Sequence, residues 1–175
     1  MIFYTADLHF GHKKIINYCN RPFFTVKEMN KEIIDNWNNK VKNKDEVYIL
    51  GDFGFVDGKE ANELLSELKG TKYLIIGNHD KFLSDANFDK SNFKGIYHYH
   101  EIMDGNKRVI LFHYPIFEWN GFYNNTIHLF GHVHNSDKFY SRVPEDFRGR
   151  AFNVGVDVNN FEPVSLKEIL ERENK

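Results

Sequence analysis

The feature that most constrains this chain is a recurring pattern in which a short apolar run stops at a side chain able to bind a metal ion. The pattern occurs in five segments, Asp7-Leu8-His9, Gly51-Asp52, Gly77-Asn78-His79-Asp80, Phe112-His113 and Gly131-His132-Val133-His134. In open α/β sheets, ligands bind in the crevice beyond the carboxyl ends of the strands. If each apolar run is a strand, the five polar segments can meet in one crevice although they are far apart in the sequence.

The first half of the chain alternates segments of strand and helix character. Apolar runs of strand length occupy residues 2–6, 47–50 and 73–76. Between them, residues 25–41 and 59–69 carry apolar side chains at helical spacing. This alternation predicts parallel strand pairing in an α/β sheet.

The second half is richer in strands. Asp104-Gly105-Asn106 separates two apolar runs and predicts a hairpin turn. Further strands are expected at 127–130 and 151–158. Ser165 and Glu168 have the spacing of a capping box, which predicts a terminal helix over 165–172. We therefore expect two sheets packed face to face, with helices outside.

The composition fits one folded domain over residues 1–175. Apolar residues make up 41% of the chain, enough for a sizeable core. The net charge of -2 provides no basic field toward membranes or extended nucleic acid, so we disfavour such partners. A single cysteine is consistent with a reducing compartment. With no signal peptide or membrane-spanning run in the sequence, we expect a cytoplasmic protein.

The residue types in the five segments suit first-row transition metals, which imidazole and carboxylate ligands bind well. In Asp7-x-His9 and His132-x-His134, the two side chains would share one face of a regular strand and could reach one ion. A carboxylate such as Asp52 can bridge two ions through its two oxygens. Two ions roughly 3.5–4 Å apart can clamp a phosphoryl group and supply a hydroxide nucleophile.

Each segment alone also has a simpler interpretation. An Asp-x-His pair is common on surfaces and at helix caps, and a lone histidine such as His113 after an apolar run is usually a core residue. Gly-Asn-His-Asp also suits an ordinary polar turn. The complete set, in this order and with each segment at a predicted strand end, favours a metal centre.

The ordered set resembles the signature blocks of the calcineurin-like metallophosphoesterase superfamily, D-x-H, G-D, G-N-H-[DE], H and G-H-x-H, over 7–134. The resemblance is to small single-domain members of bacterial or phage type. It implies a metallophosphatase-like α/β fold, a four-layer α-β-β-α sandwich of two mixed β-sheets flanked by helices. It also implies a dinuclear site for two divalent transition-metal ions, with manganese, iron, nickel and zinc as the candidates.

Carried over by position, the resemblance implies seven metal ligands. They are Asp7, His9 and His134 for the first ion, Asn78, His113 and His132 for the second, and Asp52 as the bridge. His79 would contact the phosphate and protonate the leaving group, and Asp80 would orient His79. Relatives often have G-D-x-x-D as the second block, and Phe55 stands where that later carboxylate is expected.

Three further residues are candidate substrate contacts. His12 either begins a helix or contacts a phosphate. Arg21 either binds a phosphate through its guanidinium fork or is solvated. Tyr114 either lines the pocket or packs. Residues 82–100 and 118–126 are the loops expected to face the substrate.

The expected activity is hydrolysis of a phosphate ester by a metal-bound hydroxide. A phosphodiester or small nucleotide-like substrate is favoured, because a chain with no room for a cap domain leaves an open site. The alternatives are a phosphomonoesterase, a nuclease acting on strand ends, and a catalytically silent metal-binding scaffold that serves as an interaction module. The complete ligand set together with His79 disfavours the scaffold.

Overall fold

The computed structural model describes residues 1–173, which form two four-stranded β-sheets. The first sheet has the order β1 (Ile2–Thr5), β2 (Glu46–Ile49), β3 (Thr71–Ile75) and β4 (Gly95–Tyr97). The second sheet has the order β5 (Tyr99–Asp104), β6 (Lys107–Phe112), β7 (Ile127–Phe130) and β8 (Ala151–Asn153). Strands β5 and β6 are antiparallel, and all other neighbouring pairs are parallel.

The predicted pair of sheets with flanking helices is present, but only the second sheet is mixed. Its antiparallel pair is the predicted hairpin, in which Asp104 pairs with Lys107 and leaves a two-residue turn at Gly105 and Asn106. Gly105 has a φ of 60°, a left-handed conformation that glycine adopts without strain. The first sheet is wholly parallel because longer crossover segments connect each strand to the next.

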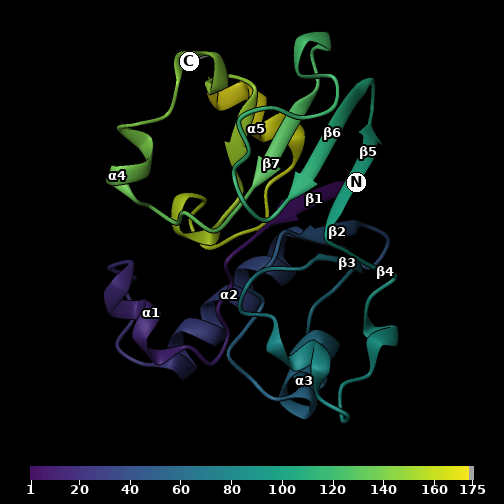
Figure 1. Cartoon of the computed structure of the whole chain (residues 1–175). Coiled ribbons are helices and arrows are strands. Elements are labelled where there is room, and N and C mark those ends of the chain that lie inside the picture. The colour runs from purple at the N-terminus through teal and green to yellow at the C-terminus, as the bar shows by residue number, and fades with distance from the viewer. Residues whose placement is uncertain (174–175) are drawn as a thin grey trace.

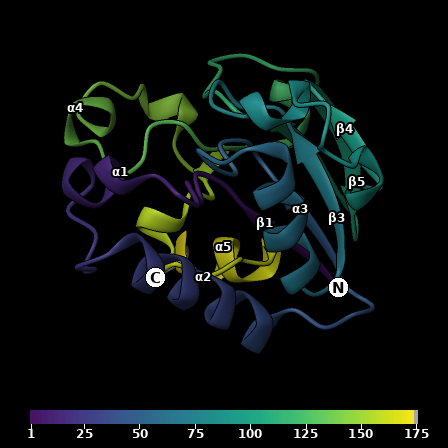
Figure 2. The ribbon, with the colours of Figure 1, turned by 90° about the horizontal axis from the view of Figure 1, so that it is seen from below.

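Helices flank both sheets. Figure 1 shows α1 (Lys13–Tyr18), α2 (Val26–Lys40) and α3 (Gly58–Glu67) on the side of the first sheet that faces away from the second, and Figure 2 shows α2 and α3 from below. The other α-helices are α4 (Asp137–Tyr140) and α5 (Leu166–Glu173). The 3-10 helices are η1 (Lys81–Ser84), η2 (Lys90–Asn92), η3 (Phe122–Asn124), η4 (Glu145–Phe147) and η5 (Val156–Val158).

The helices expected over 25–41, 59–69 and 165–172 correspond to α2, α3 and α5. The capping box of α5 is reciprocal: the Glu168 amide donates to Ser165 Oγ at 3.3 Å, and the Ser165 amide donates to Glu168 Oε2 at 2.7 Å. Helices α1 and α4 are short; the start of α1 agrees with the interpretation of His12 as a residue that begins a helix, and α4 has no predicted counterpart. Within the described chain, no helix is both long and apolar enough to cross a bilayer.

The two expected substrate-facing loops contribute aromatic side chains to the hydrophobic core, and neither lines the cavity described below. Segment 82–100 buries its three phenylalanines beneath the helices of the first sheet. Segment 118–126 buries Trp119 and Phe122 on a face of the second sheet. Large aromatic side chains gain more free energy from burial than from facing water, which explains why these predictions were wrong.

Candidate metal centre

The first group of ligand side chains lies just beyond β1 and β7. Donor atoms of Asp7, His9 and His134 all lie within 4.8 Å of one another. His9 Nε2 is buried and has no hydrogen-bond partner among the described residues. A buried polar atom without a partner is costly unless something else uses its lone pair. A metal ion at this position would do so, and the donor set therefore fits one.

The second group lies beyond β2, β6 and β7, and donor atoms of Asp52, His113 and His132 also lie within 4.8 Å of one another. His113 Nδ1 donates to the Leu50 carbonyl at 2.7 Å, which leaves Nε2 with its lone pair in the neutral ring. That atom lies 3.0 Å from Asn78 Oδ1. Two acceptors facing each other at this distance suit a shared cation.

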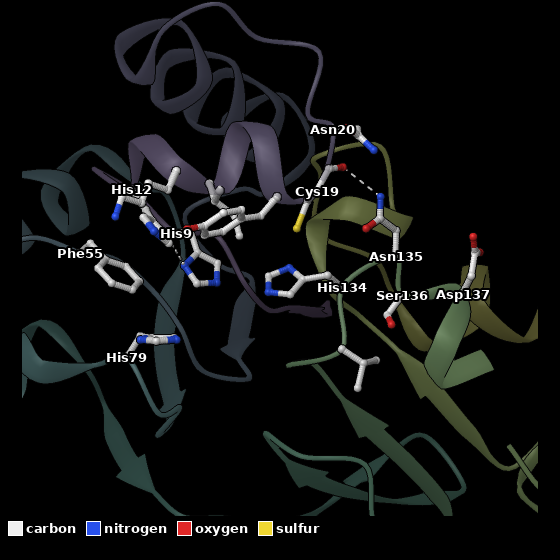
Figure 3. A pocket seen from close by; sticks show the side chains of 14 residues that line it. His9, His12, Cys19, Asn20, Phe55, His79, His134, Asn135, Ser136 and Asp137 are labelled. Atoms are coloured by element: carbon white, nitrogen blue, oxygen red, sulfur yellow. Dashed lines mark hydrogen bonds between the residues drawn. The ribbon is translucent and has the colours of Figure 1, made fainter. Parts of the chain in front are cut away.

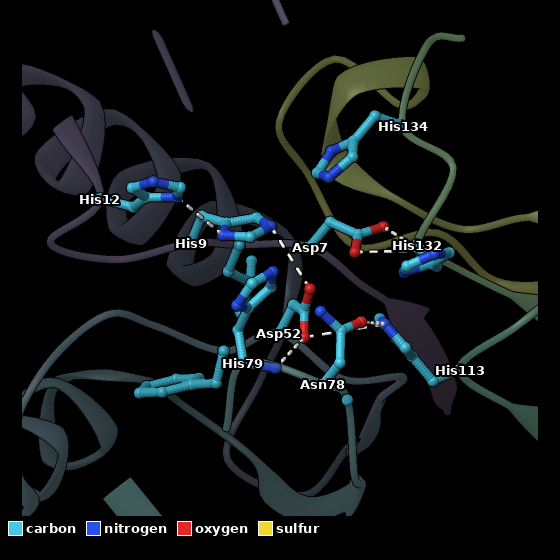
Figure 4. A network of polar contacts seen from close by, with 12 residues as sticks. Asp7, His9, His12, Asp52, Asn78, His79, His113, His132 and His134 are labelled. Atoms are coloured by element: carbon cyan, nitrogen blue, oxygen red, sulfur yellow. Dashed lines mark hydrogen bonds and ion pairs between the residues drawn. The ribbon is translucent and has the colours of Figure 1, made fainter. Parts of the chain in front are cut away.

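Asp52 lies between the two groups, as Figure 4 shows. Its Oδ2 is 3.6 Å from His9 Nε2, and its Oδ1 is 3.7 Å from His113 Nε2. Oδ1 also accepts the backbone N–H of His79 at 2.9 Å. One carboxylate oxygen therefore faces each group, which is the arrangement that a bridging ligand requires.

The electrostatics of the groups also favour a cation. Burial, against an opposing effect of His134 and with smaller contributions from the charges of Asp52 and Asp157, raises the pKa of Asp7 to about 8. Burial lowers the pKa of His9, His113 and His132, so these rings are held in the neutral form that binds metals. At His134 burial acts in the same direction, but the hydrogen bond to Asp157 and the charge of Asp7 outweigh it and raise the pKa to about 10, so an ion would have to displace a proton from that ring. A divalent ion would offset the cost of burying the carboxylates.

The ligand residues have an unusual backbone. Nine non-glycine residues of the described chain have positive φ, and five of them are predicted ligands: Asp7, His9, Asp52, His132 and His134, with φ from 48° to 70°. Residues other than glycine rarely adopt this conformation, and such strain concentrates at functional sites. Left-handed turns, and not the side-chain alternation of a regular strand, bring Asp7 and His9 into one group. His132 and His134 belong to different groups, so the expectation that each pair shares one strand face and reaches one ion is wrong for that pair, and for Asp7 and His9 it is wrong in its mechanism.

Two glycines make room for this packing. A Cβ on Gly77 would lie 2.3 Å from Asp52 Oδ1, and a Cβ on Gly51 would lie 2.4 Å from His113 Nδ1. Gly51 also has a φ of 87°. Both positions therefore require glycine for the ligands to occupy their observed places.

Asp80 does not contact the His79 ring through any hydrogen bond found in residues 1–173. Its buried carboxylate accepts three backbone N–H groups, from Gly77 at 2.7 Å, Phe53 at 2.7 Å and Asp52 at 3.0 Å. The prediction that Asp80 orients His79 is therefore corrected. Asp80 fixes the backbone of the turn that carries the bridging aspartate.

The first ligand group opens into a cavity of about 940 Å³, shown in Figure 3. His12, Phe55 and His79 line its wall beside His9. The rings of His12 and Phe55 stack with centroids 3.8 Å apart, and the His79 ring lies 4.6 Å from that of Phe55. Phe55, in place of the family's usual carboxylate, thus packs the two histidines at the cavity wall.

The remaining candidate contacts lie in different surroundings. His12 is the N-cap residue of α1 and also lines the cavity. Tyr114 packs edge-on against His132 with ring centroids 4.6 Å apart, and its hydroxyl donates to Asn78 Oδ1 at 3.4 Å. Arg21 is only 4% exposed and pairs with Asp157, so it is neither solvated nor part of the cavity lining. The predicted Arg21 contact with substrate is corrected accordingly.

Part of the site has no recognisable signal in the sequence. The far wall of the cavity consists of α1 with the residues that follow it and of segment 133–137. Asp157, on η5, contacts the ligand His134 from behind, with His134 Nδ1 2.7 Å from Asp157 Oδ2. No motif surrounds Asp157, and its only sequence signal is that a charged residue stands in the apolar run 151–158.

Comparisons with known proteins agree with this geometry. The family profile described as calcineurin-like phosphoesterase matches residues 1–172. The chain is 38% identical over 172 residues to the uncharacterized protein MJ1445 of Methanocaldococcus jannaschii, covering 97% of this chain and 89% of that protein. It is also 38% identical over 80 residues to the gene 66 protein of Mycobacterium phage L5, covering 44% of this chain and 38% of that one.

Among solved structures, the chain is similar to a protein of unknown function, AQ665 from Aquifex aeolicus. The TM-score is 0.75 at 30% sequence identity, and the match covers 98% of both chains. The sandwich predicted from the sequence is confirmed by this match.

Proposed function

Because the chain belongs to the calcineurin-like phosphoesterase family, we propose that it hydrolyses a phosphate ester in a metal-dependent reaction. The observation that best supports this is the placement of Asp52, with one oxygen toward each of two buried His/Asp groups. Two divalent ions held there would supply Lewis acidity toward the phosphoryl group and lower the pKa of an attacking water.

The residues that would hold the ions divide into two sets around the shared Asp52. They are Asp7, His9 and His134 on one side, and Asn78, His113 and His132 on the other. The left-handed turns and the clamped backbone near Asp52 hold these side chains in place before any ligand binds. Such preorganisation is what transition-state stabilisation needs.

His79 is the proposed proton donor to the leaving-group oxygen. Its backbone N–H is fixed by Asp52 Oδ1 at 2.9 Å, and its ring lines the cavity 5.7 Å from the ring of His9. Within residues 1–173 the ring makes no hydrogen bond. The imidazole is therefore available to a substrate oxygen at the site, as general acid catalysis requires.

A phosphodiester, or a small nucleotide-like substrate, is favoured over a monoester. A phosphate monoester presents only its leaving group beyond the phosphorus, whereas a diester carries a second substituent that needs space. The cavity of about 940 Å³ extends from the first ligand group past α1 and offers that space. Lys14, Tyr18 and Asn20 are among the side chains that the second substituent would meet.

The test is hydrolysis of bis-p-nitrophenyl phosphate and p-nitrophenyl phosphate with Mn, Ni, Co, Zn and Mg, together with a diester that has an alkyl leaving group. His79→Asn should lower kcat for the alkyl diester by about 10²–10⁴-fold, because an alkoxide needs the proton. The loss should be much smaller for p-nitrophenolate, a good leaving group. His98→Asn changes an exposed histidine outside the cavity and is the matched control.

Three outcomes would change the conclusion. No turnover with any metal, in a protein shown to bind two ions, would favour a metal-binding scaffold. Faster hydrolysis of the monoester than of the diesters would favour a phosphomonoesterase. An equal loss with both leaving groups in the His79→Asn protein would remove the proton-donor role of that residue.

A further inference from the structure

We propose that the buried pair of Arg21 and Asp157 positions the three ligands of the first metal group and thereby sets its metal affinity. The inference rests on the proposed metal centre. The Arg21 and Asp157 side chains are 0% and 2% exposed. Arg21 Nε donates to Asp157 Oδ1 at 2.8 Å, and Arg21 Nη2 donates to Asp157 Oδ2 at 2.9 Å.

The carboxylate of this pair reaches the ligand His134. His134 Nδ1 donates to Asp157 Oδ2 at 2.7 Å. This hydrogen bond fixes the rotation of the ring and leaves Nε2 as the nitrogen that can bind an ion. A carboxylate behind a metal-binding histidine has this effect in metalloproteins generally.

The guanidinium of the pair reaches the segment that carries the other two ligands. Arg21 donates to the carbonyl of Asp7 at 2.7 Å and to the carbonyl of Leu8 at 3.0 Å. These carbonyls belong to the left-handed turn in which Asp7 and His9 have φ of 56° and 54°. One guanidinium thus holds the turn of two ligands and the carboxylate behind the third.

Only arginine has the donors for this task. The contacts use four N–H directions in one plane, two toward Asp157 and two toward backbone carbonyls, whereas a lysine has a single nitrogen. A buried ion pair seldom stabilises a fold more than apolar side chains of the same size would. Positioning of the ligands therefore explains the pair better than stability does.

A second interpretation of the same residues is excluded by the charges. Donor atoms of Cys19, His134 and Asp157 also lie within 4.8 Å of one another, a spacing that by itself could hold an ion. Both oxygens of Asp157 already accept hydrogen bonds from the Arg21 cation. A metal ion there would meet a positive charge and an occupied carboxylate, so this group is no metal site.

The test measures Mn²⁺ binding by calorimetry in a His113→Ala background, which removes a ligand of the second group and leaves the first. The double change Arg21→Met/Asp157→Leu replaces the pair with apolar side chains of similar size. We expect Mn²⁺ binding to weaken by about 10–100-fold, the usual effect of removing a group that orients a metal ligand. Arg21→Lys keeps the charge but loses the fork, and it should also weaken binding.

The matched control is Lys40→Met in the same background. Lys40 forms a partly buried ion pair with Glu162 at 2.9 Å and with Glu168 at 2.8 Å, outside the cavity lining. The Lys40→Met substitution should leave the Mn²⁺ affinity unchanged even if it lowers the urea concentration at the midpoint of unfolding. Unchanged affinity in a folded double variant, or in Arg21→Lys if the double variant does not fold, would overturn the positioning role. Failure of the wild-type protein to bind Mn²⁺ would overturn the metal centre itself and this inference with it.

Discussion

Replacing Asp80 by asparagine should destabilise the metal-free protein by ~3–6 kcal/mol. Asp80 is 5% exposed, and its Oδ2 accepts the N–H groups of Gly77 and Asp52 while Oδ1 accepts that of Phe53. Asparagine can keep its one acceptor oxygen at the Oδ2 position, but its NH2 group then faces the N–H of Phe53. Hydrogen bonds to a charged group contribute about 1.5–3 kcal/mol each and those to a neutral group about 0.5–1.5 kcal/mol, so one bond is lost and the other two fall to the neutral value. The sum is a large share of the ~5–15 kcal/mol that stabilises a typical domain.

The assay is urea unfolding in the presence of a chelator, followed by circular dichroism. Asp85→Asn is the matched control, because Asp85 also accepts two backbone N–H groups, from Gly58 and Asn87, each at 2.9 Å. Asp85 is partly exposed, so water can replace the lost acceptor and the loss of stability should be much smaller than at Asp80. His79→Asn should leave the unfolding midpoint in place, because the ring has no hydrogen bond to lose in the described structure.

An unchanged stability of the Asp80→Asn protein would refute this reasoning. If Asp80→Asn unfolds at the wild-type urea concentration yet alters the pH profile of turnover as His79→Asn does, Asp80 acts through His79. The backbone clamp would then contribute little, and the role implied by the sequence would replace it.

Two further predictions concern close packing and pH. Gly77→Ala places a Cβ 2.3 Å from Asp52 Oδ1, so the bridging carboxylate must move. Mn²⁺ binding measured by calorimetry should weaken by at least ~10-fold. An unchanged Mn²⁺ affinity would contradict the need for glycine at this position. Burial lowers the pKa of His128 from 6.5 to about 4, and its ring nitrogens lie 3.3 and 3.2 Å from the carbonyls of Ile110 and Tyr114. The unfolded chain then binds a proton at His128 more readily than the folded chain does. The free energy of unfolding is therefore at its full value above pH 6.5 and falls by about 3 kcal/mol as the pH is lowered to 4. His128→Gln should remove this part of the pH dependence in urea unfolding of the metal-free protein; equal slopes would refute it.

The sequence was most informative where the signal is local. Each ligand segment follows an apolar run directly, so strand and ligand could be recognised together, and the structure brings the segments to one place. The capping box of α5 is also local, since Ser165 and Glu168 are three residues apart. Helix α1 lacks such a signal: its N-cap, His12, makes no capping hydrogen bond through its side chain.

Contacts between distant residues could not be predicted in the same way. Arg21 and Asp157 are 136 residues apart, and neither stands in a motif. A lone arginine in a loop suggests a solvated or substrate-binding group, and only the fold shows that it is buried. Asp80 was misassigned for a related reason, because its sequence neighbour His79 suggested a partner, whereas its acceptors face the backbone of residues 52, 53 and 77.

The left-handed turns link these distant contacts to the site. A non-glycine residue in this conformation costs about 1–2 kcal/mol, so five ligands with φ from 48° to 70° cost ~5–10 kcal/mol together. Strain of that size persists only where surrounding contacts over-determine it. Arg21 supplies such contacts at the carbonyls of Asp7 and Leu8, and Asp80 supplies them at the N–H of Asp52. If the hydrogen bonds of Arg21 or of Asp80 are removed, the turn that they hold relaxes. An ion that binds must then order this turn, and the free energy of ordering reduces its affinity. The Mn²⁺ affinity of the Asp80→Asn protein should therefore fall together with its stability, and a stability loss without an affinity loss would separate the two.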